Sequence, residues 1–167
     1  MNTAPSTQRP ALSPAITEGM AQVEAVISQK LSTDAPILRE ISNYLLTIGG
    51  KRIRPLICIL SARALGLQTI SQDLINVAAG IELIHSATLL HDDIIDKSPK
   101  RRHEVSPFVK YGLSGTLLSG DFLLVRAFSL CTHIEPFVID ATERACISLT
   151  EGEILETPLY KVTHSLD

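Results

Sequence analysis

The chain has 167 residues, of which 45% are hydrophobic and 4% aromatic, and its formal net charge is −3. A chain of this length buries about two-thirds of its unfolded surface and fits one domain. Few aromatic residues and a slight negative charge argue against base-stacking platforms and basic nucleic-acid surfaces, so we expect no nucleic-acid partner.

No apolar run reaches the roughly 18 residues of a membrane span, because Glu82, His85, His91 and Asp92 interrupt the longest ones. The N-terminus also lacks the apolar core of a signal peptide. We therefore expect a soluble, cytoplasmic protein without a membrane span. The three cysteines are Cys58, Cys131 and Cys146. They lie in apolar helical patterns and lack the paired spacing of metal ligands, so we expect reduced thiols, which are typical of the cytoplasm.

The N-terminal third predicts a leader and three helices. Residues 1–14 are polar and rich in proline, which is typical of a flexible leader. Apolar residues at three- and four-residue steps predict a helix over 15–31 and a second from Pro36 to Ile48, where Gly49-Gly50 ends it. A basic turn over 51–55 precedes a short apolar helix over 56–65.

The remainder predicts three further helices. Ser71 is placed to cap a long helix that runs to Asp96, and residues 97–107 form a polar, basic connection. Two apolar helices follow, over 116–133 and 135–156, and no strand alternation is present. The predicted class is all-α, with a bundle of about six helices and residues 15–167 belonging to one domain.

The end of the long helix carries the most informative pattern. Asp92 and Asp96 are four residues apart, so their carboxylates share one helix face, and His85 lies near that face two turns earlier. Parallel carboxylates repel each other, and Mg²⁺ commonly binds one or two of them together with phosphate oxygens. Asp93 points elsewhere and is the weaker ligand candidate. A solvated helix end is the alternative for this pattern.

Two basic islands accompany these acids. Lys100, Arg101 and Arg102 follow Asp96 closely enough to turn back over a metal-bound diphosphate, and guanidinium groups match phosphate oxygens. Residues 49–55 combine glycines, which allow close approach of an anion, with Lys51 and Arg54 at a helix start. A solvated loop and a helix-cap turn are the respective alternatives.

Five ordered motifs resemble those of the trans-isoprenyl diphosphate synthases, the polyprenyl synthetase family. Residues 49–55 resemble its G-G-K-R-x-R-P motif, and residues 82–87 with 91–96 resemble its first aspartate-rich helix. The other three are Arg101-Arg102, Gly120–Leu123 and Glu151–Glu153. The resemblance covers about residues 36–156 and implies part of an isoprenoid-synthase-type fold.

The resemblance also implies roles for individual residues. Asp92 and Asp96 would hold the Mg²⁺ ions that bind an allylic prenyl diphosphate, with Arg101 on the same group. Isopentenyl diphosphate would be bound by Lys51, Arg54, His85 and Arg102. The implied reaction is head-to-tail condensation, in which pyrophosphate leaves, the isopentenyl double bond attacks the allylic cation and a proton is lost. The implied assembly is a homodimer.

Product length is predicted from residues one turn before the acids. Family members with short products carry a bulky aromatic there, whereas this chain has Ala87 and Thr88, with Ser86 beside them. We therefore expect an open tunnel and a medium- or long-chain product. Tight helix packing is the alternative reason for small residues here.

The chain departs from the family pattern in several places. His103-Glu104-Val105 replaces a segment that usually begins with glycine, Lys97 replaces a commonly acidic residue, and Glu156 stands where glutamine is expected. A second aspartate-rich motif and a Lys-Thr pair do not occur before Asp167. The sequence therefore predicts the N-terminal half of a prenyltransferase, inactive alone. A non-catalytic subunit and a terpene cyclase are the alternatives.

Overall fold

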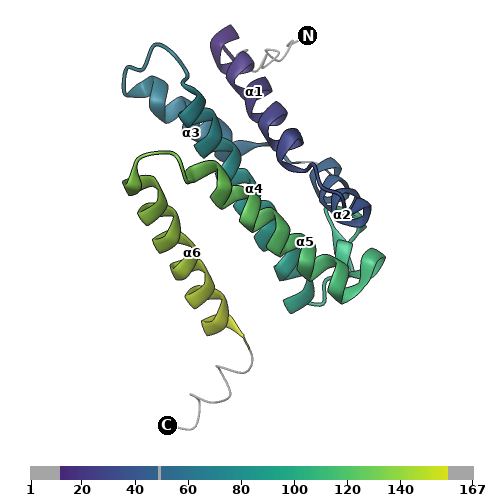
Figure 1. Cartoon of the computed structure of the whole chain (residues 1–167). Coiled ribbons are helices and arrows are strands. Elements are labelled where there is room, and N and C mark those ends of the chain that lie inside the picture. Colours follow the sequence, from purple (N-terminus) through teal and green to yellow (C-terminus); the bar gives the residue numbers. More distant parts are fainter. Residues whose placement is uncertain (1–11, 49, 158–167) are drawn as a thin grey trace, which may run out of the picture. The chain divides into compact units, whose positions relative to one another are not determined.

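The structure is a computed structural model that describes residues 12–48 and 50–157. It divides into two compact units, residues 1–130 and 131–167. The first unit contains α1 (Pro14–Lys30), α2 (Pro36–Thr47), α3 (Ile53–Ala64), α4 (Gln72–Ile95) and nearly all of α5 (Pro107–Cys131). The second contains α6 (Pro136–Glu156). The described residues thus form six helices, and the predicted all-α class is confirmed (Figure 1).

The long helix α4 is the centre of the first unit, where it packs against α1, α2 and α3. Its start is the predicted one, because the Ser71 hydroxyl accepts a hydrogen bond from the Leu74 amide at 3.2 Å. Apolar side chains from four helices meet around it and are fully buried, among them Ile27, Ile41, Ile59, Leu83 and Leu90. The polar residues of α4 therefore lie on a helix whose position is fixed by its core.

The N-terminal helices follow the prediction with small shifts. The first begins at Pro14, one residue earlier than expected, and the rest of the predicted leader up to residue 11 lies outside the described residues, as does Gly49. The third begins at Ile53 and not at Leu56. Pro55 is compatible with that start because amides in a first helical turn have no intrahelical acceptor to lose.

The start of α5 was predicted nine residues too late. The helix begins at Pro107, after Ser106, whose hydroxyl accepts from the Val109 amide at 3.2 Å. A break at Gly112, where φ is +76°, separates a first short helical segment from the main helix. This break interrupts the helical periodicity, which explains why only the later segment was predicted.

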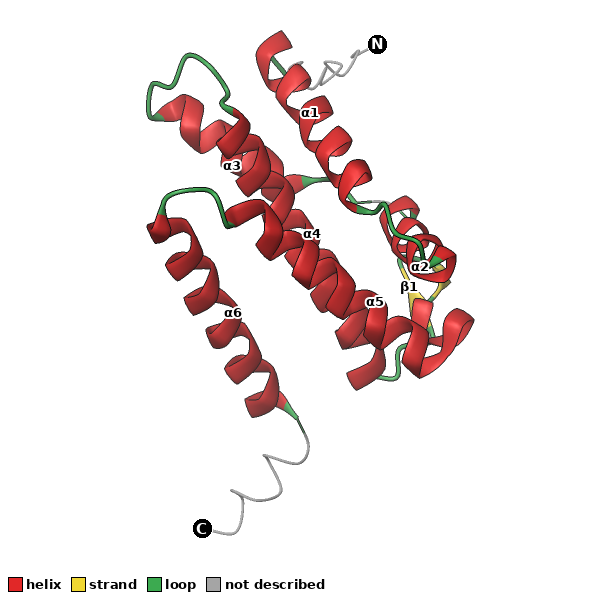
Figure 2. Ribbon diagram, in the orientation of Figure 1, coloured by secondary structure: helices red, strands yellow, loops and turns green. Residues whose placement is uncertain are grey.

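The expectation of no strands was wrong for residues 100–105. Lys100–Arg101 (β1) and Glu104–Val105 (β2) pair antiparallel, with Lys100 opposite Val105. Figure 2 draws the strands in yellow. The connecting residues Arg102 and His103 have φ values of +49° and +76°, as a two-residue type I′ turn requires. Strands of two residues are too short to produce an alternation signal.

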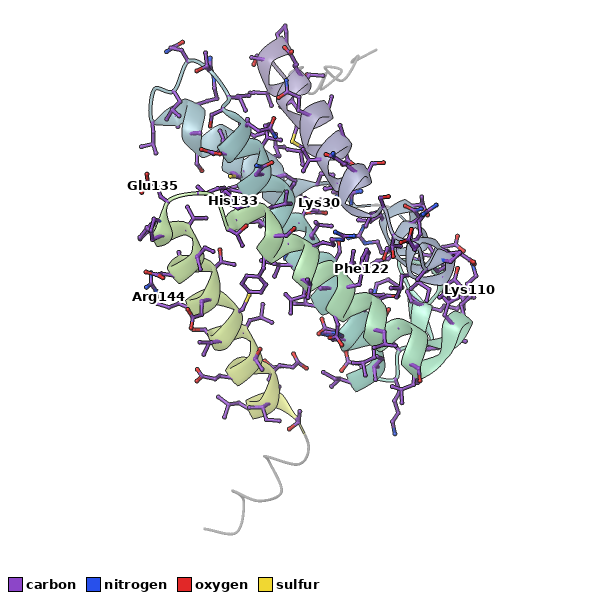
Figure 3. All side chains as sticks on the ribbon, viewed as in Figure 1. Lys30, Lys110, Phe122, His133, Glu135 and Arg144 are labelled. Atoms are coloured by element: carbon purple, nitrogen blue, oxygen red, sulfur yellow. The ribbon has the colours of Figure 1, made fainter. Side chains whose placement is uncertain are left out.

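Side-chain contacts join the C-terminal part of α5 to the end of α1. Lys30 donates to the Ser129 hydroxyl at 3.1 Å, and Arg126 donates to the Ser32 carbonyl oxygen at 2.7 Å. The Arg126 guanidinium also lies 5.1 Å from the centre of the Phe122 ring. Figure 3 labels Lys30 and Phe122 on these two helices. These contacts fix the helix that carries the predicted Gly120–Leu123 motif.

The second unit matches the prediction closely, since α6 begins one residue after the expected Glu135 and ends at Glu156. No side chain of α6 is buried. Figure 3 labels Arg144 on this helix. All three cysteines of the chain are free, and burial raises the pKa of each thiol.

Among the described residues, two helices, α4 and α5, are long and apolar enough to cross a membrane by length and composition alone. In the 18-residue segment of each helix that meets this criterion, 50% of the α4 segment and 33% of the α5 segment is buried inside the protein. The core helix of a soluble protein passes the same test, so this finding is weak support for a membrane span.

Candidate functional site

A cavity of about 490 Å³ lies between the turn that precedes α3 and the polar face of α4. Four cations and one carboxylate surround it, so its lining is strongly positive. The lining residues are Gly50, Lys51, Arg52, Ile53, Arg54, Glu82, His85 and Arg102. The turn, the middle of α4 and the hairpin loop thus contribute to one site.

Arg52 is held in place by carboxylates from two helices. Its Nε donates to Glu24 Oε1 of α1 at 2.6 Å, and its Nη1 donates to Glu82 Oε1 of α4 at 3.2 Å. Burial raises the pKa of Glu82, an effect that Arg52 opposes. Sequence reasoning assigned no role to these three residues, although Arg52 and Glu82 lie within two of the motifs. The i+3 spacing of Glu82 and His85 was a usable signal for Glu82, since it places both on one face of α4.

The His85 imidazole is surrounded by positive charge. Burial, followed by the charges of Arg54, Arg102 and Arg101, lowers its pKa to about 4. His85 is therefore neutral near pH 7 and can donate or accept a single hydrogen bond without adding charge. The same interactions show that these three arginines lie close enough to act on one group.

The acidic end of α4 contains three carboxylates in different environments. Burial raises the pKa of Asp92; Arg101 opposes this shift, while Asp96 and Asp93 add to it. Asp96 is exposed at the helix end, whereas Asp93 is fully buried. Arg101 donates from Nε to Asp93 Oδ1 at 2.9 Å and makes a second bond through Nη2 to the same oxygen. Asp93 thus faces Arg101, and its lower rank as a metal ligand stays a prediction.

The helices α4 and α5 approach each other closely where Gly120 and Asp121 of α5 lie against His91 of α4. A Cβ atom on Gly120 would lie 2.3 Å from His91 Nε2, so only glycine leaves room for this ring. The same nitrogen is 3.4 Å from the Leu117 carbonyl oxygen and 3.3 Å from Asp121 Oδ1. His91, which directly precedes Asp92, is therefore held in place by α5.

Of the predicted chain-length residues, Ala87 is 1% exposed and belongs to the hydrophobic core. Thr88 is partly buried, and its hydroxyl donates to the His85 carbonyl oxygen at 2.9 Å. Ser86 is buried beside them.

The structure brings most of the predicted phosphate-binding residues together. Lys51, Arg54, His85 and Arg102 line the main cavity. Arg101 lines an adjoining cavity of about 20 Å³ that also includes His85 and Arg102. Asp92 and Asp96 line neither cavity. Asp92 is linked to this site through Arg101, whose charge acts on both Asp92 and His85.

The acidic end of α4 offers a metal ion two spaced carboxylates. In residues 12–48 and 50–157, no three His, Cys, Asp or Glu side chains are grouped to hold a metal ion. Asp92 and Asp96 provide two carboxylates on one helix end. That donor set fits Mg²⁺, which binds few protein ligands and completes its shell with water and phosphate oxygens.

Comparisons with known proteins identify relatives of this chain. The octaprenyl diphosphate synthase of Escherichia coli (strain K12) is 38% identical over 140 residues, which are 83% of this chain and 43% of that protein. The decaprenyl diphosphate synthase structure from Rhodobacter capsulatus has a TM-score of 0.81 at 35% identity, over 85% of this chain and 44% of that one. A polyprenyl synthase from Caulobacter crescentus CB15, solved with calcium and isoprenyl diphosphate, has a TM-score of 0.80 at 34% identity, over 88% of this chain and 47% of that one.

The chain spans less than half the length of these relatives. The sequence model of the family described as polyprenyl synthetase matches residues 35–167, which include the cavity, the acidic helix end and the close approach at Gly120. The chain therefore belongs to the polyprenyl synthetase family.

Proposed function

We propose that this chain forms part of a trans-prenyltransferase that condenses isopentenyl diphosphate with an allylic prenyl diphosphate. The observation that carries the proposal is the cavity in which Lys51, Arg54 and Arg102 surround a neutral His85, close to a helix end with two spaced carboxylates. Diphosphates are the polyanions that such a cluster would bind.

Isopentenyl diphosphate would occupy the cavity. Lys51, Arg54 and Arg102 form no ion pair with the described carboxylates, so their charges are available to a ligand. His85 would add a hydrogen bond. This arrangement supports direct recognition of a diphosphate without a metal ion.

The allylic diphosphate would bind beside Asp92 and Asp96 through Mg²⁺, with Arg101 on the same group. The metal would supply charge that stabilises the departing pyrophosphate. Asp92 and Asp96 would hold it, Arg101 would bind the phosphate oxygens, and the residues of the cavity would orient the isopentenyl double bond. Loss of a proton after attack on the allylic carbon completes the condensation.

The proposal is tested by mixing the protein with Mg²⁺, an allylic diphosphate and labelled isopentenyl diphosphate. The assay is run on the 167-residue chain and on a version extended with the downstream coding sequence. We expect elongated polyprenyl diphosphate from the extended version and none from the chain alone. No product from either would favour a non-catalytic subunit, whereas cyclised hydrocarbon from the allylic substrate alone would favour a terpene cyclase.

We further propose a medium- or long-chain product, because Ala87 and Thr88 present small side chains below the acidic helix end. Replacing Ala87 with Phe should shorten the product of the extended enzyme. Since Ala87 is buried, the larger ring should also destabilise the fold by about 1–3 kcal/mol. Thermal unfolding of the variant separates that effect from the change in product, and an unchanged product length would contradict the proposed tunnel.

We also propose a homodimer in the cytoplasm. The helix α5 exposes Leu113, Leu117, Leu118 and Val125, each at least 43% accessible, and such a surface suits a second copy. Sedimentation equilibrium should give twice the chain mass. A monomer at micromolar concentration would contradict this part of the proposal, and recovery of the protein in the membrane fraction would contradict its location.

A further inference from the structure

The turn that carries the cavity cations has an unfavourable backbone conformation at Arg52. Its φ is +47°, in the left-handed region that non-glycine residues adopt at a cost of roughly 1–2 kcal/mol. Arg52 directly precedes α3, and its backbone carbonyl accepts the first helical bond from the Leu56 amide at 3.1 Å. Contacts of its side chain must therefore stabilise this conformation.

Those contacts come from Glu24 and Glu82, which approach the guanidinium from α1 and α4. Glu24 lies nearest, at 2.6 Å from Nε, and its second oxygen is 3.5 Å from Nη2. A Cβ atom on Gly50 would lie 2.9 Å from Nη1, so the glycine leaves space for the guanidinium to reach both helices. Arg52 thus ties the turn to two helices that pack against each other.

The neighbours of Arg52 in the turn are cavity residues. Lys51 and Arg54 lie on either side of it in the chain and both line the cavity. Glu82 lines the cavity itself, whereas Glu24 is not a lining residue, and its side chain is 47% exposed. Glu24 also lies outside residues 35–167, the part that the family model matches.

We infer that Glu24 is a positioning residue for anion binding in the cavity, acting through Arg52 on the directions of Lys51 and Arg54. The inference rests on the proposed function, since it assigns the cavity to a diphosphate. The inference and simple electrostatics predict opposite changes in anion binding when Glu24 is removed. Removing a negative charge near an anion site should strengthen binding, whereas removing a positioning contact should weaken it.

The test is calorimetric titration of the 167-residue chain with isopentenyl diphosphate in the presence of EDTA, so that only direct binding is measured. We expect Glu24→Ala to raise Kd roughly three- to tenfold, the range expected from losing one partly exposed charged hydrogen bond. Glu24→Gln, which keeps one acceptor for Arg52, should fall between the unmodified chain and Glu24→Ala.

Glu18→Ala is the matched control, because it removes the same charge from an exposed position on α1. It should leave Kd unchanged or lower it. In an Arg52→Ala background, Glu24→Ala should have no further effect on Kd. Thermal unfolding of each variant separates a change in Kd from a loss of folded protein.

Equal or tighter binding by folded Glu24→Ala would overturn the inference while leaving the proposed function intact. Failure of the unmodified chain to bind would instead count against the cavity as a diphosphate site, and the inference would fall with it.

Discussion

Arg101 lies against Asp93, with its Nε 2.9 Å from Asp93 Oδ1, and this pair connects the hairpin after α4 to the helix itself. The Asp93 side chain is fully buried, that of Arg101 is 22% exposed, and Asp93 Oδ2 has no hydrogen-bond partner among the described residues. A buried carboxylate is costly without a partner, so Asp93 depends on Arg101. The pair also leaves Arg101 close enough to influence Asp92.

We predict that Asp93→Ala lowers the free energy of unfolding by about 1–3 kcal/mol, because it removes the anchor of the hairpin and opens buried space. In this variant the Arg101 guanidinium can still reach solvent, so the loss of unfolding free energy is smaller than for a fully buried ion pair. Urea denaturation followed by circular dichroism measures the change. Asp96→Ala at the exposed end of the same helix is the control and should change stability by less than about 0.5 kcal/mol. Equal effects of the two variants would contradict the assigned role of Asp93.

Gly120→Ala should destabilise the protein by about 1 kcal/mol. The added methyl group would displace the His91 ring, which would lose its contacts with Leu117 and Asp121. Gly152→Ala is the matched control, because nothing lies within 4 Å of a Cβ there and alanine favours a helix by up to about 1 kcal/mol. Thermal unfolding should show opposite signs for the two variants. An unchanged stability of Gly120→Ala would contradict this prediction, because the His91 ring would then move aside without a cost in free energy.

His103→Gly should stabilise the hairpin by about 0.5–1 kcal/mol. The φ of His103 is +76°, which glycine adopts readily, although the greater freedom of glycine in the unfolded chain offsets part of the gain. Glu104→Gly in the adjacent strand is the control and should destabilise. A lower melting temperature for His103→Gly would indicate that its imidazole makes a contact that outweighs the backbone cost.

The proposed anion site should change the ionisation of His85. Its folded pKa of about 4 lies below the ordinary value of 6.5, so between these values the unfolded chain binds more protons than the folded one. Stability should therefore fall as the pH decreases from about 6.5 to about 4, and His85→Gln should reduce that fall. A bound diphosphate offsets the repulsion from the arginines and should raise the pKa.

An NMR titration of the His85 imidazole, with and without inorganic pyrophosphate, measures this change. A midpoint near 6.5 in the free chain would contradict the burial and the surrounding charge.

The all-α fold class and most helix positions could be predicted from the sequence because they depend on local signals. The Ser71 cap and the periodic apolar residues around Leu83 and Leu90 are examples. The hairpin at 100–105 could not, because it depends on two residues with positive φ that sterics alone would disfavour. Gly112 likewise breaks a helix within an apolar stretch without a periodicity signal.

The site was predictable where charge and spacing coincide. Lys51, Arg54, His85 and Arg102 were identified, and the structure gathers them around one cavity. The partners Glu24 and Glu82 of Arg52 were missed, since their pairing joins helices that are distant in the chain. The metal role of Asp92 and Asp96 remains a prediction.

The central claim is that Asp92 and Asp96 bind Mg²⁺ and thereby an allylic diphosphate. Calorimetric titration of the extended protein with a non-reactive allylic diphosphate analogue, with Mg²⁺ and with EDTA, tests it most directly. We predict Mg²⁺-dependent binding that is lost in Asp92→Ala and in Asp96→Ala, with helicity unchanged, and is retained in Asp73→Ala at the exposed start of the same helix. Unchanged Mg²⁺-dependent binding in both Asp92→Ala and Asp96→Ala would contradict the claim.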